Sequence, residues 1–202
     1  PRVARQSSAT GFYHVMIRGI NRENIFGSKA AKKEILEILS AKTSDADMDI
    51  YAYCVMDNHI HLLVKAELQE LSMVMKKVNG SFAMYYNKEK DRIGSVFQGR
   101  FRSEQVEDQA HFWGVMRYIH LNPVKACMVQ KATDYPWSSI RYFLTGKSQL
   151  LADNALSMKQ DNFKDNESFL YMHEEEDLGI YLEVTEELDD VKKTVSERML
   201  EM

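Results

Sequence analysis

Short stretches in which hydrophobic and polar residues alternate are separated, along most of the chain, by stretches in which hydrophobic residues recur every three or four positions. The first pattern is typical of β-strands and the second of amphipathic helices. The predicted strands are residues 12–18, 50–55, 59–65 and 95–106, the last interrupted by Gly99. The predicted helices begin at the N-cap Ser28, at Leu68 and at about Asp108; the second ends near Lys90 and the third near Asn122, with Pro123 beyond it.

These elements follow one another as strand, helix, strand, strand, helix, strand, and a further helix. The turn at residues 56–58 is short enough to join its two strands as a hairpin. A β-α-β-β-α-β order is that of the ferredoxin-like split βαβ arrangement. The sequence therefore predicts an α+β fold, with a four-stranded antiparallel sheet and helices on one face.

The pattern weakens towards the C-terminus. Residues 137–143 predict a short helix that packs onto the domain, and residues 145–162 have the composition of a loop. The acidic stretch 163–202 has helical character in places but no strong core pattern. We therefore divide the chain into a domain at 1–147 and an acidic, partly helical or irregular C-terminal extension at 148–202.

Charge is distributed unevenly along the 202 residues, which carry a formal net charge of −4. From residue 161 onwards there are 14 acidic and four basic residues, a net charge of −10, which leaves +6 for residues 1–160. A basic body with an acidic tail differs electrostatically from a uniformly acidic protein. The body can therefore attract phosphate.

Composition excludes several classes of protein. Hydrophobic residues make up 45% of the chain, which supports a packed core. No apolar run approaches the roughly 18 residues of a membrane span, and no apolar segment follows the first residues as in a secretory signal. Cys54 and Cys127 lack a Cys-x-x-Cys partner and have apolar sequence neighbours, so we expect reduced core residues in a cytoplasmic protein without a membrane association.

The first candidate chemistry is His59-Ile60-His61 on a predicted strand. Side chains alternate between the two faces of a strand, so both imidazoles point to one side and Ile60 to the other. Two imidazoles so placed can reach a single divalent metal ion. The alternative is a pair of unrelated surface histidines.

The second candidate is Tyr118 with Asn122, whose spacing of four residues places them on one face of a helix. An amide oxygen is a hard ligand suited to Mg²⁺ or Mn²⁺ and could complete a site with His59 and His61. The alternatives are an ordinary core tyrosine and a polar residue in a frayed last helical turn, since the residue before Pro123 is biased away from helical geometry.

The third candidate is a set of basic residues at the ends of the predicted elements and in loops. These residues are Arg18, Arg22, Lys76, Lys77, Arg100, Arg102, Lys125 and Arg141. They form either a track for phosphates or an ordinary solvated surface.

Four strings in order carry a resemblance to a known family. They are residues 14–22 (HVMIRGINR), 56–64 (MDNHIHLLV), 97–101 (FQGRF) and 117–126 (RYIHLNPVKA), and residues 135–139 (YPWSS) add to them. Together they resemble the single-tyrosine HUH transposases, closest to the IS200/IS605-like branch that includes the REP-associated tyrosine transposases. The resemblance covers about residues 10–147.

This resemblance implies a ferredoxin-like domain that acts on single-stranded DNA, often at hairpin ends. It implies that His59 and His61 are the histidines of the HUH motif, that Asn122 is the third ligand of Mg²⁺ or Mn²⁺, and that Tyr118 is the nucleophile. Relatives include homodimers that share the site between subunits as well as monomers.

We therefore expect a metal-dependent endonuclease and strand transferase that forms a 5′-phosphotyrosine intermediate. Two other classes stay open: a binding module for nucleic acid without catalysis, and a transposase derivative that regulates through DNA binding without turnover. A structural zinc site does not fit, because a closed site needs four ligands and neither cysteine is placed to supply one.

Overall fold

The computed structural model describes residues 5–146, 148 and 150–174. Its strands are β1 (Phe12–Arg18), β2 (Met48–Val55), β3 (His59–Ala66) and β4 (Arg102–Gln105). Its α-helices are α1 (Lys29–Thr43), α2 (Leu68–Glu89), α3 (Gln109–Lys125), α4 (Ile140–Thr145), α5 (Ala155–Asn162) and α6 (Asn166–Tyr171). Two short 3₁₀ turns, η1 (Ile20–Arg22) and η2 (Ala132–Asp134), complete the described elements. None of the described helices is long and apolar enough to cross a bilayer.

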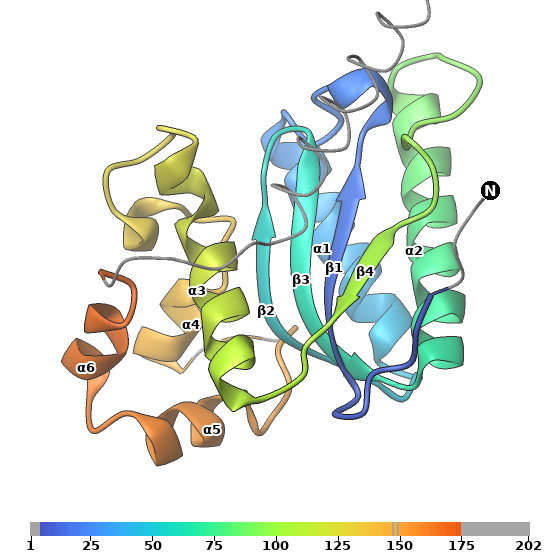
Figure 1. The fold of residues 1–202 in the computed structure, drawn as a ribbon. Helices are drawn as coiled ribbons and strands as arrows, with labels where there is room; N and C mark the ends of the chain where they lie inside the picture. The colour runs from blue at the N-terminus through green and yellow to red at the C-terminus, as the bar shows by residue number, and fades with distance from the viewer. Residues whose placement is uncertain (1–4, 147, 149, 175–202) are drawn as a thin grey trace, which may run out of the picture.

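The four strands form one sheet in the order β2-β3-β1-β4, and every neighbouring pair is antiparallel. This arrangement confirms the predicted α+β fold with its split βαβ order (Figure 1). The hairpin of β2 and β3 turns at residues 56–58, as the sequence predicts. It follows that β3, which carries the two histidines, lies inside the sheet with β1 and β2 on either side.

Side-chain caps explain where two of the helices begin. The Ser28 hydroxyl accepts a hydrogen bond from the backbone N–H of Ala31, so α1 starts at the predicted cap. The Asp108 carboxylate accepts from the backbone N–H of His111 in the same way at α3. Both caps satisfy helix N–H groups that have no partner within the helix.

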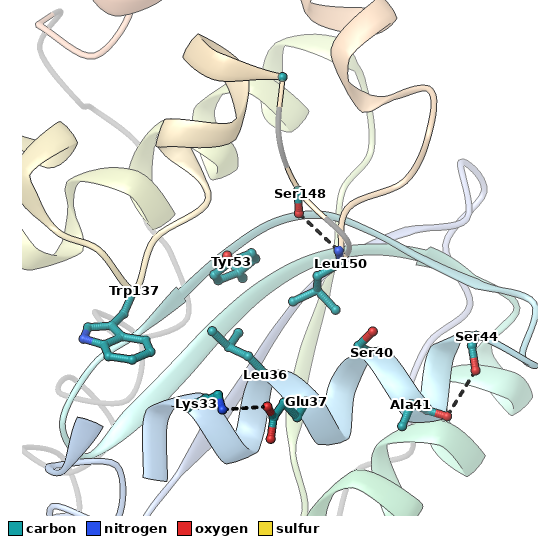
Figure 2. A pocket seen from close by; sticks show the side chains of 11 residues that line it. Lys33, Leu36, Glu37, Ser40, Ala41, Ser44, Tyr53, Trp137, Ser148 and Leu150 are labelled. Carbon is teal, nitrogen blue, oxygen red and sulfur yellow. Dashed lines mark hydrogen bonds and ion pairs between the residues drawn. The ribbon is translucent and has the colours of Figure 1, made fainter. Parts of the chain in front are cut away.

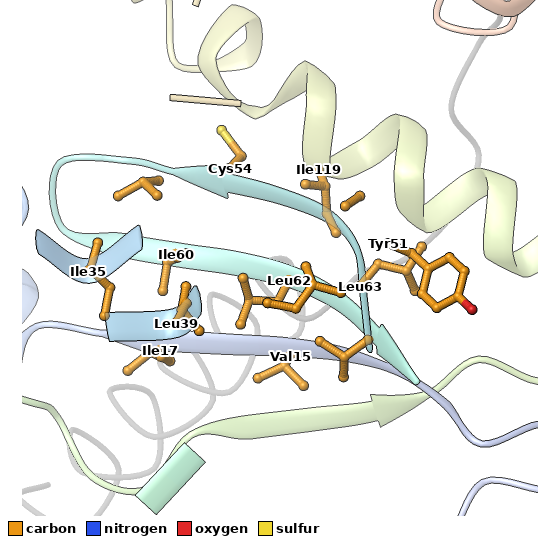
Figure 3. Close-up of a cluster of buried hydrophobic side chains, with 14 of the residues drawn as sticks. Val15, Ile17, Ile35, Leu39, Tyr51, Cys54, Ile60, Leu62, Leu63 and Ile119 are labelled. Atoms are coloured by element: carbon orange, nitrogen blue, oxygen red, sulfur yellow. The ribbon is translucent and has the colours of Figure 1, made fainter. Parts of the chain in front are cut away.

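One face of the sheet is a continuous apolar layer under α1 and α2. Val15 and Ile17 of β1 and Ile60 and Leu62 of β3 are all buried on it. Figure 3 shows α1 laid over these strands with Ile35 directed at them. Burial of this apolar face stabilises the packing of α1 and α2 on the strands.

The helix α3 packs on the opposite face. The Phe112 ring of α3 lies 5.0 Å from the Phe12 ring of β1 and 5.8 Å from that of Tyr51 on β2. Phe12 has the same strand parity as His14 and Met16, so these side chains share the face that α3 covers. The two helices of the split βαβ order thus cover one face as predicted, and the helix that follows them covers part of the other.

The C-terminal helices pack onto α3. Phe169 of α6 is fully buried, with ring contacts to Phe163 at 5.3 Å and to Phe143 of α4 at 5.2 Å. The Trp113 ring of α3 in turn meets that of Phe163 at 4.9 Å. Residues 150–174 are therefore attached to the helix that carries Tyr118. The tail at 175–202, with ten of the 14 acidic residues found from residue 161 onwards, lies outside the described residues.

Three predicted elements differ in the structure. The strand predicted at 95–106 forms only at β4 (Arg102–Gln105). Residues 95–101, which precede it, make a single bridge between Phe97 and Gly19, and Gly99 has a φ of +158°. The segment predicted as a loop at 145–162 contains α5. The segment at 137–143 forms a helix only from Ile140, because its first residues pair with the exposed edge of β2.

The helix end predicted near Asn122 and the burial predicted for Cys127 are wrong. The helix α3 continues through Pro123 to Lys125, so Asn122 lies inside it, and the Asn122 carbonyl accepts a regular bond from Ala126. Cys127 is exposed after the end of α3, with a φ of +54°, whereas Cys54 is buried as predicted. Apolar sequence neighbours do not place Cys127 in the core, because the chain turns at the surface there.

Candidate active site

The two histidines of β3 point towards α3 and are shielded from solvent. His59 is 5% exposed and His61 is fully buried. Their ring centroids lie 4.8 Å apart with the planes at 87°. The alternation of the strand thus brings both imidazoles to one side of the sheet, as the sequence predicts. The alternative of two unrelated surface histidines is not what the structure shows.

Each of these rings is hydrogen-bonded through its Nδ1 atom to another side chain. His59 Nδ1 lies 2.5 Å from Oδ1 of Asn58, and His61 Nδ1 lies 2.9 Å from Nε2 of His14. An amide oxygen can only accept, so Nδ1 of His59 carries the hydrogen and donates it. The Nε2 atoms are then the atoms through which the two rings would bind a metal ion.

Tyr118 lies on α3, with its ring against those of His61 and His14. Its ring centroid is 5.4 Å from that of His61 and 5.7 Å from that of His14, both edge to face. The side chain is 3% exposed, and Nζ of Lys125 lies 4.8 Å from the ring centroid. Among the tyrosines that the structure describes, Tyr118 is therefore the one whose ring meets His61 with a cation beside it.

Asn122 lies one turn further along α3 and is buried. Its amide nitrogen donates to the carbonyl oxygen of Tyr118 at 3.2 Å. This bond fixes which end of the amide is which, so Oδ1 is the atom through which Asn122 would bind a metal ion. The structure brings His59, His61 and Tyr118 together through their rings and keeps Asn122 on the same helix as Tyr118.

These donors fit a divalent cation. No group of three or more His, Cys, Asp or Glu side chains within the described ranges could hold a metal ion. Two imidazoles and one amide oxygen are neutral ligands, and a cation held by them keeps its charge for an anionic substrate. A carboxylate-rich magnesium site is thereby excluded from the described residues, but a site completed by phosphate oxygens is not.

The loops at this end of the sheet are tied to one another. The Gly19 amide donates to the carbonyl of Asn58 at 2.8 Å, and the Ile20 amide to that of Val96 at 2.9 Å. The buried Lys32 ammonium donates to the carbonyl of Phe26 and to the Asp57 carboxylate. The turn that precedes His59 is therefore held at both Asp57 and Asn58.

The predicted basic residues divide between two regions. Arg18 is the cross-strand partner of His59, Arg102 is that of Met16, and exposed Arg22 and Arg100 lie in the adjoining loops. Lys125 stands over Tyr118. In contrast, Lys76 and Lys77 are exposed on α2, which covers the other face, and Arg141 on α4 donates to the carbonyl of Thr133. Only the first region adjoins the histidine pair.

A cleft of about 920 Å³, shown in Figure 2, is not lined by the histidine pair or by Tyr118. Leu36 and Ser40 of α1 line one wall, and Tyr53 and Trp137 line the other. Tyr53 alternates with Cys54, the cross-strand partner of His61, so its side chain is on the α1 face of the sheet. The cleft and the histidine pair are thus on opposite faces.

Two residues of the candidate site were missed in the sequence. His14 has the strand parity of a residue facing α3, and alternation along residues 12–18 could have placed it on one face with Phe12 and Met16. Asn58 was assigned only to the turn. Nothing in the spacing indicates that its side chain folds back onto the adjacent His59.

Comparison with models of known families identifies the class of protein to which this ferredoxin-like chain belongs. The family model described as "Transposase IS200 like" matches residues 7–122, more than half of the chain. The chain belongs to this family and is a transposase by family. No curated protein sequence matches it.

The fold is also similar to that of solved structures. One is a REP-associated tyrosine transposase bound to a REP hairpin, with 18% identity, a TM-score of 0.60, and coverage of 77% of this chain and 93% of that chain. Another, a protein from Deinococcus radiodurans described as a transposase candidate, has 17% identity, a TM-score of 0.41, and coverage of 55% and 87%. The first of these similarities supports the four-stranded fold.

Proposed function

We propose that this chain cleaves and rejoins single-stranded DNA at hairpin ends, with Tyr118 as the nucleophile and a divalent metal ion, Mg²⁺ or Mn²⁺, bound by His59, His61 and Asn122. The observation that carries the proposal is the contact between the rings of Tyr118 and His61, 5.4 Å apart and both buried. A tyrosine with a merely structural role does not need a buried imidazole against its ring that is itself paired with a second imidazole.

In the proposed reaction the Tyr118 oxygen attacks the phosphorus of the scissile phosphodiester. A bond forms between the tyrosine oxygen and phosphorus, and the bond from phosphorus to the 3′-oxygen breaks. The phenol proton passes to solvent, and the departing 3′-oxygen takes up a proton. Because the 5′-phosphotyrosine retains an ester bond, a second 3′-hydroxyl can reverse the step and join a new end.

The residues around Tyr118 supply the electrostatics. A divalent cation held there would polarise the phosphodiester and neutralise charge on its oxygens. Asn58 and His14 orient the two imidazoles through their Nδ1 atoms. Lys125 places a positive charge beside the nucleophile, where it stabilises the phosphate.

The proposed DNA partner rests on charge and on the structural neighbour. Arg18, Arg22, Arg100 and Arg102 form a basic border next to the histidine pair, suited to phosphate contacts. The similar transposase of known structure is bound to a REP hairpin. Since His61 and Tyr118 of one chain already meet, a homodimer would not be needed to unite them.

The test is incubation of the chain with labelled hairpin single-stranded DNA, with and without Mn²⁺, followed by a denaturing gel. We expect a metal-dependent adduct that mass spectrometry maps to Tyr118. Tyr118→Phe should bind the hairpin but form no adduct, while Tyr171→Phe, which changes an exposed tyrosine on α6, should behave as the unaltered chain. An adduct in Tyr118→Phe refutes the assignment, and hairpin binding without any adduct in the unaltered chain indicates a regulatory derivative.

A further inference from the structure

We propose that His14 is a positioning residue that holds His61 in the tautomer and orientation required to bind the metal ion. This inference rests on the proposed function, because it concerns the same metal site. It adds a third histidine, from a different strand, that would act only through His61.

The geometry of His14 is that of a fixed partner. His14 lies in the middle of β1, which is paired with β3 on one side and β4 on the other, and its side chain is fully buried. Its Nε2 atom is 2.9 Å from Nδ1 of His61, and the ring centroids are 5.0 Å apart. The Tyr118 ring packs edge to face against both imidazoles. The His14 ring therefore has little freedom to turn away from His61.

The direction of this hydrogen bond decides whether Nε2 of His61 is able to bind a metal ion. A neutral imidazole carries one hydrogen. If His14 donated, Nδ1 of His61 would accept and the His61 hydrogen would be on Nε2, which could not bind a metal ion. If His61 donates from Nδ1, Nε2 carries no hydrogen and has the lone pair that would bind a metal ion. We infer the second arrangement, in which His14 Nε2 accepts and its own hydrogen is on Nδ1.

The arrangement at His59 supports this inference independently. The oxygen of Asn58 can only accept, so His59 also donates from Nδ1. Both imidazoles would then carry the same tautomer, each fixed by an acceptor from a different part of the chain. Acceptors at the distal nitrogen are the usual partners of metal-binding histidines, and their loss typically weakens metal binding by about 10- to 100-fold.

The first experiment measures Mn²⁺ affinity of the full chain without DNA, by calorimetry. His14→Leu removes the acceptor and should weaken Mn²⁺ binding by about 10- to 100-fold. His14→Gln places an amide oxygen close to the position of Nε2 and should restore affinity towards that of the unaltered chain. Met16→Ala is the matched control, because Met16 is buried on the same strand and is the cross-strand partner of His61. It should leave the affinity unchanged.

The second experiment reads the tautomer directly. In the metal-free chain with ¹⁵N-labelled histidine, NMR should show the His61 hydrogen on Nδ1 and the His14 hydrogen also on Nδ1. A His61 hydrogen on Nε2 overturns the inference, and this readout stands even if His14→Leu fails to fold.

The outcomes separate this inference from the proposed function. If the unaltered chain binds no Mn²⁺, the metal site of the proposed function fails. If the unaltered chain and His14→Leu bind Mn²⁺ equally well, only the role of His14 fails. Weaker binding in His14→Leu together with recovery in His14→Gln supports it.

Discussion

His120 of α3 and His173, two residues beyond α6, stack with their ring centroids 5.2 Å apart, and Nδ1 of His120 lies 2.9 Å from Nε2 of His173. The backbone of Tyr53 donates to the Ser139 hydroxyl, which then donates to Nε2 of His120. His120 donates to His173, whose Nδ1 donates to the Phe169 carbonyl. Each imidazole thus donates once and accepts once, and this buried chain of bonds ties α3 to β2 and α6.

This chain of bonds predicts that stability falls in mild acid. Burial lowers the pKa of His173 from 6.5 to about 4, with the charge of Arg117 adding to the effect. The unfolded chain therefore binds more protons than the folded chain between these values, and stability present above pH 6.5 is lost as the pH falls towards 4. The shift corresponds to about 3 kcal/mol at most.

The measurement is the free energy of unfolding in urea at pH 7.5, 6 and 5. His173→Gln keeps an acceptor for His120 but has no proton to gain, so its stability should fall less steeply with acid than that of the unaltered chain. Carboxylates titrate in both proteins, and the difference between the two curves isolates His173. Parallel curves would contradict the assigned pKa.

The first part of the fold could be predicted from local sequence signals. Alternation along β1 and β3 and the cap at Ser28 each act within a few residues, so the sequence contains them directly. The extent of β4 could not be predicted, because its pairing with β1 ends at Met16 and Arg102 although β1 continues to Arg18. The helix α5 was missed because its apolar pattern is weak and it is held by contacts with distant residues such as Phe143.

The candidate site also has a part that local sequence signals predict and a part that depends on tertiary contacts. Strand alternation predicts that His59 and His61 lie on one face of the sheet. Helical spacing predicts that Tyr118 and Asn122 lie on one face of a helix. The meeting of β3 with α3 is a tertiary contact, which only the family resemblance anticipated. Fine placement, such as His14 against His61, depends on the register between strands, and a single sequence does not contain it.

Gly19 is predicted to be required because there is no space for a side chain at this position. Its φ of −61° suits any residue, but a Cβ atom would lie 2.4 Å from the carbonyl oxygen of Glu23. Gly19→Ala should therefore displace the turn bonded to Asn58 and lower the free energy of unfolding by about 1–3 kcal/mol. Gly80→Ala is the control: a Cβ atom there meets nothing within 4 Å, and α2 should gain about 0.5–1 kcal/mol. Equal urea midpoints for the two variants would contradict this account.

Lys32 is predicted to stabilise the turn before His59. Its buried ammonium donates to the Phe26 carbonyl at 2.7 Å and to the Asp57 carboxylate. Lys32→Met leaves the carbonyl buried without this donor and should lower the free energy of unfolding by about 1–3 kcal/mol. Lys33→Met removes only an exposed pair with Glu37 and should change it by less than about 0.5 kcal/mol. Urea unfolding measures the change in the free energy of unfolding for each variant. Equal changes in the two variants would contradict a stabilising role of Lys32.

Lys125 is predicted to act on the phosphate at Tyr118 more than on DNA binding as a whole. Its Nζ lies 4.8 Å from the centre of the Tyr118 ring, so in the proposed function its charge is close to the scissile phosphate. Lys125→Met should slow adduct formation by about 10- to 100-fold, the value of a charged contact of roughly 1.5–3 kcal/mol. It should also reduce the slope of log affinity against log salt by about 1, as expected for one lost phosphate contact.

Lys131→Met is the matched control for this prediction, because Lys131 is exposed and lies after α3, at the start of η2. Its rate of adduct formation should equal that of the unaltered chain. Single-turnover gels at saturating hairpin concentration separate the rate from the affinity, and filter binding at several salt concentrations gives the slope. If Lys125→Met lowers only the affinity and the saturated rate is unchanged, the lysine serves DNA binding alone and not the chemical step.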